Sequence, residues 1–115
     1  MRVADKLDRE WAKDPSCRAH APSEYYRTTQ TAYLQALKTH GVSAAELGPH
    51  ADIADTSLAL AVDPALVRED KLAGPYPPGV TGNPKRASAA LGELGTTLIV
   101  DATVAAIRRA TQAPR

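Results

Sequence analysis

The fold is decided by the stretch Asn83-Pro84-Lys85-Arg86-Ala87-Ser88-Ala89-Ala90-Leu91-Gly92-Glu93-Leu94-Gly95, which opens a long apolar C-terminal segment. Asn is a favoured N-cap and Pro a favoured first helical residue, so this opening predicts a helix over about 84–112. Apolar residues then recur at three-four spacing, which is typical of a helix with one buried stripe. The residues of this predicted stripe are Leu91, Leu94, Leu98, Ala102 and Ala105.

Two glycines, Gly92 and Gly95, lie inside this predicted helix. Glycine in a helix interior costs up to about 1 kcal/mol relative to alanine. We therefore expect another element to pack closely against that turn.

Three further helices are predicted upstream. Val3, Leu7 and Trp11 recur every four residues, which indicates an amphipathic helix from the first few positions. Helical spacing of apolar and aromatic residues predicts a second helix over about 24–40 and a third over about 53–62.

Only one β-strand is predicted, over about 16–22, ahead of the Pro22-Ser23 break. The 115 residues fit one domain, 1–115, and 43% of them are apolar. There is no Phe and much Ala, so the core gains little free energy per side chain. The residues by themselves indicate a fold in which helix predominates and strands are few.

Charge and composition argue against several classes of protein and of binding partner. The net charge is +1 with acids and bases interspersed, which gives no electrostatic footprint for nucleic acid or an anionic membrane. Cys17 is the only cysteine, so no intrachain disulfide is possible. No window reaches about 18 uncharged apolar residues, and the N-terminus lacks a signal-peptide pattern. These features predict a soluble cytoplasmic protein.

Candidate chemistry lies in Gly48-Pro49-His50-Ala51-Asp52-Ile53-Ala54-Asp55-Thr56-Ser57-Leu58. Helical spacing brings Asp52 and Asp55 to one face of the predicted helix, and His50 lies just before its first turn. Such a group could act in acid-base chemistry or lie beside a metal. The alternative is structural: Asp52 caps the helix, Asp55 favours its positive end, and His50 is a solvated loop residue. The spacing alone leaves both interpretations open.

Tyr25 and Tyr26 are weaker candidates for lining a binding pocket. Adjacent tyrosines at a helix start are more often one core ring and one surface ring. His20 and His40 are interpreted as structural residues, because one lies beside the predicted strand and the other at a helix C-terminus.

These residues resemble a pattern of the creatininase family of metal-dependent amidohydrolases. The family has a phrase of the type His-Ala-Gly-x-x-Glu-Thr-Ser, and this chain has His50-Ala51-Asp52-Ile53-Ala54-Asp55-Thr56-Ser57. An Asp-Pro-x-Leu-Val-Arg phrase matches Asp63-Pro64-Ala65-Leu66-Val67-Arg68. A Gly-Val-x-Gly-Asp/Asn-Pro entry into a long Ala-rich helix matches Gly79-Val80-Thr81-Gly82-Asn83-Pro84. The resemblance spans about residues 20–112.

The resemblance implies an α/β layered fold, usually a homohexamer, that hydrolyses a cyclic or linear amide C–N bond. It implies two divalent metals, zinc or manganese, and a histidine that shuttles a proton to the leaving nitrogen. His50 occupies that histidine position and Asp55 stands where the family more often has a metal-site Glu. Asp52, Tyr25 and Tyr26 are then expected beside the substrate.

The chain departs from the family pattern at several positions. Asp52 replaces a glycine, and Glu46-Leu47-Gly48-Pro49 lacks the Trp-containing segment of creatinine-hydrolysing members. The family's main metal ligands come from a Glu-x-His motif, a following Asp and a Gly-His-Gly-Gly-Asn-like turn, none of which occurs here. We therefore expect the C-terminal half of such a protein, inactive and without bound metal on its own.

Three interpretations follow from these departures. The first is a fragment that needs a complementary N-terminal half, or a homo-oligomer, for activity on a small-molecule amide. The second is a truncated, non-catalytic α/β interaction or scaffold module. The third is an intact enzyme whose site combines His20, His50 and nearby carboxylates.

Overall fold

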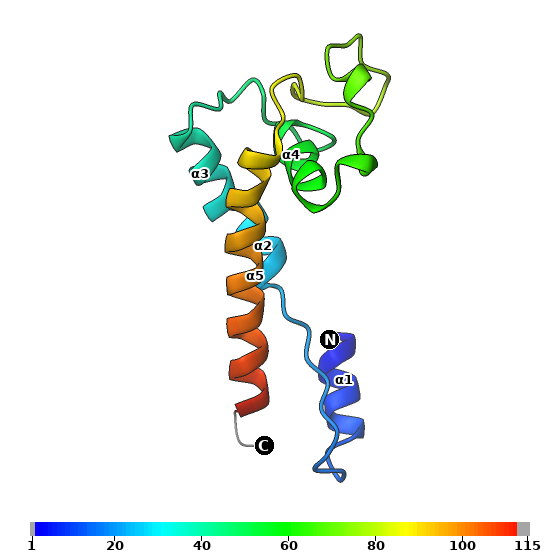
Figure 1. Cartoon of the computed structure of the whole chain (residues 1–115). Helices are drawn as coiled ribbons and strands as arrows, with labels where there is room; N and C mark the ends of the chain where they lie inside the picture. Colours follow the sequence, from blue (N-terminus) through cyan, green and yellow to red (C-terminus); the bar gives the residue numbers. More distant parts are fainter. Residues whose placement is uncertain (1, 113–115) are drawn as a thin grey trace.

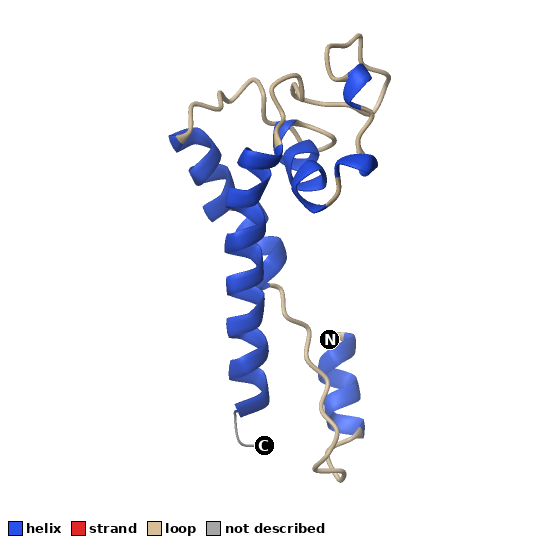
Figure 2. Cartoon of the chain, viewed as in Figure 1, coloured by secondary structure: helices blue, strands red, loops and turns tan. Residues whose placement is uncertain are grey.

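The computed structural model describes residues 2–112, and within them the chain forms helices joined by loops (Figures 1 and 2). The helices in chain order are α1 (Val3–Glu10), α2 (Glu24–Gln30), α3 (Ala32–Thr39), α4 (Ile53–Val62), the 3-10 turns η1 (Pro64–Leu66) and η2 (Glu69–Lys71), and α5 (Ala89–Gln112). The long helix α5 is the axis on which α2, α3 and α4 pack.

The expected α/β fold is wrong, because none of residues 2–112 forms a strand (Figure 2). The predicted strand over 16–22 is a turn followed by loop, with no partner strand among residues 2–112. Backbone hydrogen bonds in this segment include one from Cys17 N–H to the Asp14 carbonyl at 3.2 Å and one from Ala19 N–H to Asp8 Oδ1 at 3.3 Å, and neither belongs to a β-ladder. A strand needs a ladder to satisfy its backbone groups. The described chain is a packed set of helices.

The long helix begins five residues later than predicted. Asn83 Oδ1 accepts from Lys85 N–H at 2.9 Å, and Ala87 N–H donates to the Pro84 carbonyl at 2.8 Å, so these residues close a separate turn. The helix itself is capped by Ser88, whose Oγ accepts from Leu91 N–H at 3.2 Å. Two polar residues compete as caps here, and the second one starts α5.

The helix predicted over 24–40 is broken at Thr31, which has φ −130° and ψ −86°. Thr31 Oγ1 donates to the Arg27 carbonyl at 2.7 Å. Threonine side chains compete with helix hydrogen bonding in this way, and their branched Cβ disfavours helix. The break separates exposed Tyr26 on α2 from buried Tyr33 and Leu37 on α3.

The core lies where α3, α4 and the first half of α5 meet. Its buried residues are Tyr33, Leu37, Val42, Ile53 and Ala54. The predicted stripe residues of α5 are half-buried rather than fully buried, and Leu91 and Leu94 pack against this core.

The close packing expected at the two glycines of α5 is confirmed. A Cβ on Gly92 would collide with the backbone carbonyl of Ser57 on α4. A Cβ on Gly95 would lie 2.7 Å from both Leu58 Cδ2 and the ring of Tyr33. The two glycines therefore set the distance between α5 and its neighbours.

The described chain is elongated. Its radius of gyration is 17.9 Å, whereas a compact domain of this length has about 13 Å. Helix α1 lies to one side and buries none of its residues (Figure 1). Large apolar side chains are consequently exposed on α1, on the turn that follows it and on the second half of α5, among them Val3, Trp11, Val100, Val104 and Ile107.

Helix α5 is also long and apolar enough, by length and composition, to cross a membrane. It contains two acidic residues, Glu93 and Asp101, and packs against α2, α3 and α4. The core helix of a soluble protein has the same length and apolarity, so these two properties do not distinguish the cases.

Candidate functional site

The loop that carries His50 is fixed by hydrogen bonds to Thr81. Thr81 N–H donates to the His50 carbonyl at 2.9 Å, and His50 N–H donates to Thr81 Oγ1 at 3.0 Å. The Thr81 hydroxyl also lies 3.2 Å from the His50 carbonyl and donates to it. The backbone of His50 is thus held while its side chain is exposed.

Two glycines allow these segments to approach so closely. A Cβ on Gly48 would lie 2.5 Å from the Thr81 carbonyl oxygen. Gly82 has φ +81°, and a Cβ there would lie 2.6 Å from the Glu46 carbonyl oxygen. That same carbonyl accepts from Asn83 N–H at 3.1 Å. The His50 segment and the segment 79–84 therefore form one structural unit.

An ion pair between Glu46 and Arg86 also stabilises this structural unit. Arg86 Nε lies 2.7 Å from Glu46 Oε1 and Nη2 lies 2.8 Å from Oε2, which is a bidentate geometry. Ser43 N–H and Ser43 Oγ each donate to Glu46 Oε2 at 2.9 Å. The hydrogen bonds from Arg86, and then those from Ser43, lower the pKa of Glu46 to about 2.

Asp52 is the N-cap of α4 and is 2% exposed. Its Oδ1 accepts from Asp55 N–H at 2.8 Å, and its Oδ2 accepts from Gly48 N–H at 2.8 Å. Both carboxylate oxygens therefore serve backbone donors. The structure places Asp52 as the tie between the His50 loop and α4.

Asp55 and Thr56 hold the residue that follows His50. Ala51 has φ +50°, a left-handed conformation that is uncommon for a residue with a Cβ. Its N–H donates to Asp55 Oδ2 at 3.1 Å, and its carbonyl accepts from Thr56 Oγ1 at 3.4 Å. These two side chains stabilise the turn at the mouth of α4.

Ser57, on the buried side of α4, joins α4 to the residue that precedes α5. It is fully buried, and its Oγ accepts from Ser88 N–H at 3.1 Å. The motif Asp55-Thr56-Ser57 thus fixes both the His50 loop and the start of α5. Sequence reasoning missed Ser57, Thr81 and Ser88, because each acts on a segment about 30 residues away.

A cavity of about 280 Å³ gathers most of the predicted site residues. Tyr26, His50, Asp52 and Asp55 all line it. Tyr25 does not line it; its ring meets the Tyr26 ring edge-on at 6.5 Å and 75°. We name this the His50 cavity.

Tyr33 also lines the His50 cavity and was predicted only as part of the helix over 24–40. Its hydroxyl donates to the Ala54 carbonyl at 3.2 Å. Burial, and then the negative charges of Asp52 and Asp55, raise the pKa of Tyr33 well above its usual value. Tyr33 is therefore a neutral hydrogen-bond donor at any physiological pH.

The described residues do not fit a metal centre. Between residues 2 and 112 no three His, Cys, Asp or Glu side chains lie together in a way that could hold an ion. His50 and Asp55 are exposed potential ligands at the His50 cavity, whereas Asp52 is 2% exposed and both its oxygens accept from backbone N–H groups. Any metal at the His50 cavity needs ligands from elsewhere.

The other two histidines lie away from the His50 cavity. His20 lines a different cavity, of about 580 Å³, beside α1 and the end of α5. His40 follows α3, and its Nδ1 lies 2.8 Å from the Ala36 carbonyl oxygen. The structure does not bring His20 and His50 together, as a self-contained site would require.

Comparison with known proteins gives one result that bears on function. The family model for creatininase, described as creatinine amidohydrolase, matches residues 1–107. Comparisons with curated proteins and with solved structures give no match. The family match covers the His50 loop, α4 and most of α5. On this match, together with the His50 motif, the chain belongs to the creatininase family of amidohydrolases.

Proposed function

We propose that this chain supplies the proton-transfer histidine, His50, of a site that hydrolyses a cyclic or linear amide C–N bond. The observation that carries the proposal is the placement of His50: an exposed side chain on a fixed loop, at a cavity shared with Tyr26 and Asp55. The family membership gives the reaction class.

Amide hydrolysis requires a proton for the leaving nitrogen, since an amide anion is a very poor leaving group. Histidine suits this step because its ordinary pKa lies near neutral pH. The carboxylate of Asp55 lines the same cavity as His50. Tyr26, whose side chain is exposed, adds an aromatic surface against which a small ring can pack.

The described residues do not supply the ligands of the two-metal centre that the resemblance implies, so the rest of that site has to come from residues outside this sequence. We propose that the chain acts as the C-terminal portion of the enzyme, in the cytoplasm, with a complementary N-terminal portion or further copies of itself. Zinc or manganese would then be held chiefly by that partner, with Asp55 as the metal ligand that we predict from this chain.

The test is complementation. The chain is mixed with a candidate N-terminal polypeptide that carries a Glu-x-His motif and a Gly-His-Gly-Gly-Asn-like turn. Stoichiometric zinc or manganese binding and metal-dependent hydrolysis of cyclic amides are expected, and His50→Ala should abolish the hydrolysis. His40→Ala is the matched control, because His40 is equally exposed but lies away from the cavity. A mixture that binds no metal stoichiometrically would sink the proposal.

A second candidate function, a non-catalytic interaction module, is favoured by the exposed apolar residues. Val100, Val104 and Ile107 lie on one face of α5 and are 56%, 37% and 49% exposed, and Trp11 on the turn after α1 is 42% exposed. Several large apolar side chains exposed on one helix face are typical of association sites. Light scattering after size exclusion tests this function. A well-behaved monomer would contradict it, and His50→Ala should leave the assembly unchanged.

A further inference from the structure

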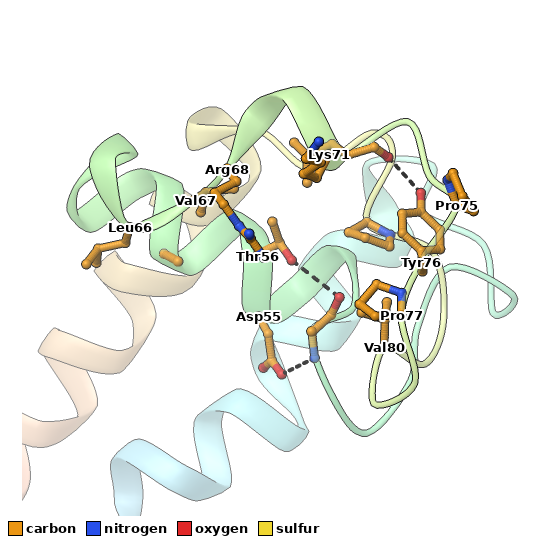
Figure 3. Close-up of a pocket in the computed structure, with 14 residues that line it drawn as sticks. Asp55, Thr56, Leu66, Val67, Arg68, Lys71, Pro75, Tyr76, Pro77 and Val80 are labelled. Atoms are coloured by element: carbon orange, nitrogen blue, oxygen red, sulfur yellow. Dashed lines mark hydrogen bonds between the residues drawn. The ribbon is translucent and has the colours of Figure 1, made fainter.

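We propose that a second cavity, which shares only Asp55 with the His50 cavity, binds a small carboxylate with an apolar body. Its volume is about 540 Å³, and it lies between α4 and the loop that follows it (Figure 3). Three prolines line it, Pro75, Pro77 and Pro84, and we name it the proline cavity.

The walls of the proline cavity are mainly apolar. Besides the prolines they include Ala59 on α4 and Leu72 and Val80 on the loop. Proline has no backbone N–H, so these walls offer few donors to water or to a polar ligand. Burial of apolar surface is therefore the main source of affinity for a ligand body here.

The loop that forms the cavity is tied in place. Tyr76 Oη donates to the Leu72 carbonyl, with the two oxygens 2.7 Å apart (Figure 3). The same hydroxyl oxygen lies 3.0 Å from Asn83 Oδ1. The same Asn83 oxygen accepts from Lys85 N–H. The cavity wall is thus anchored to the turn that precedes α5, and a ligand meets a preformed surface.

Two cations line the cavity. Arg68 follows η1, and its nitrogen atoms point towards Thr56 on α4 (Figure 3). Within the described part of the chain its guanidinium has no hydrogen-bond acceptor and no ion pair. Lys71 lies 3.3 Å from Asp70, with both side chains about 70% exposed, which makes a weak surface pair. A planar guanidinium matches a carboxylate by two parallel hydrogen bonds.

The charge of the lining favours an anion. Asp55 is the one carboxylate that lines the proline cavity, and its Oδ2 already accepts from Ala51 N–H. Two cations therefore face one partly engaged carboxylate. One cationic pair against extensive apolar walls fits a monocarboxylate better than a multiply charged phosphate. The inference concerns binding alone and does not rest on the hydrolysis proposed for His50.

Octanoate is the probe for this site, and the whole chain is titrated with it by heteronuclear NMR. We expect saturable one-to-one binding, with shifts confined to the amides of residues 66–80 and the start of α4. Octanol and octylamine, which have the same apolar body, should bind at least about tenfold more weakly, because they lack the charge-assisted hydrogen bonds.

Arg68→Met removes the guanidinium and keeps the apolar stem, and we expect it to weaken octanoate binding about tenfold or more. The matched control is Arg108→Met, because Arg108 is an exposed residue of α5 that does not line the proline cavity; this variant should leave the affinity unchanged. Three results would overturn the proposal: no saturable binding, equal affinity for octanol, or full affinity in folded Arg68→Met. Shifts centred on α1 or the end of α5 would overturn it too, since they would show adsorption to exposed apolar surface.

Discussion

His50 and Thr81 are hydrogen-bonded to each other in both directions, through the Thr81 N–H to the His50 carbonyl and the His50 N–H to Thr81 Oγ1. The two residues are 31 positions apart, and their contact joins the loop before α4 to the loop before α5. This contact fixes the backbone of His50, while among residues 2–112 no hydrogen bond is made to the exposed imidazole itself.

Thr81→Val tests that relationship. The substitution keeps the shape and the Thr81 N–H but leaves the His50 N–H without its acceptor, which should cost about 1–2 kcal/mol of unfolding free energy. Urea denaturation measures the loss, and Thr81→Ser should recover most of it. Thr97→Val on the exposed side of α5 is the control and should change stability little. Equal stability of the two valine variants would argue against the role of the Thr81 hydroxyl.

Gly92→Ala tests the contact between α4 and α5. Alanine would gain up to about 1 kcal/mol of helix propensity, but its Cβ collides with the Ser57 carbonyl, and overpacking of this kind costs about 1–3 kcal/mol. We expect net destabilisation in thermal and urea unfolding. Thr97→Ala on the same helix has no such neighbour and serves as control. A more stable Gly92→Ala protein would contradict the observed packing.

Asp52→Ala tests the tie between the His50 loop and α4. The buried carboxylate accepts from two backbone N–H groups, so its removal should cost about 2–3 kcal/mol. Asp63→Ala is the matched control, because Asp63 caps only the short turn η1 through Ala65 N–H. That control should cost less than about 1 kcal/mol. Similar losses of unfolding free energy in the two variants would mean that the two hydrogen bonds of Asp52 stabilise the fold no more than the single one of Asp63.

The ion pair of Glu46 with Arg86 predicts a pH dependence of stability. The folded pKa of Glu46, about 2, lies below the ordinary unfolded value, so its contribution is complete above about pH 4.5. It is lost as the pH falls towards 2. The melting temperature of the wild type should therefore fall more steeply between pH 4.5 and 2 than that of Glu46→Gln. Parallel melting curves over this range would contradict the assignment.

The helices were predictable because their periodicity is local. The stripe from Leu91 onwards indicated α5, and Gly92 and Gly95 indicated close packing, which is confirmed. Helix boundaries were not predictable, because Asn83 and Ser88 are both good caps and only tertiary contacts decide between them. The strand over 16–22 failed since a strand depends on a partner elsewhere in the chain.

Local sequence patterns likewise predict one part of the candidate site and miss the other. Capping by Asp52 follows from spacing within one turn, and the structure places Asp52 there. The hydrogen bonds of Thr81 with His50 and of Ser88 with Ser57 join segments that are distant in the sequence, and no local sequence pattern predicts them. The proline cavity is likewise built from α4 and the loop 66–84, which the sequence shows only as a turn-rich stretch.

The most direct test of the central claim is the rate of amide hydrolysis in the complemented system with His50→Ala, compared with wild type and His40→Ala at several pH values. If His50 delivers the proton, the His50→Ala rate should fall by about 10²-fold or more, with loss of the pH dependence near neutrality, while His40→Ala keeps the wild-type profile. Folding of each variant is checked by circular dichroism. A folded His50→Ala protein that hydrolyses the amide at the wild-type rate would contradict the claim.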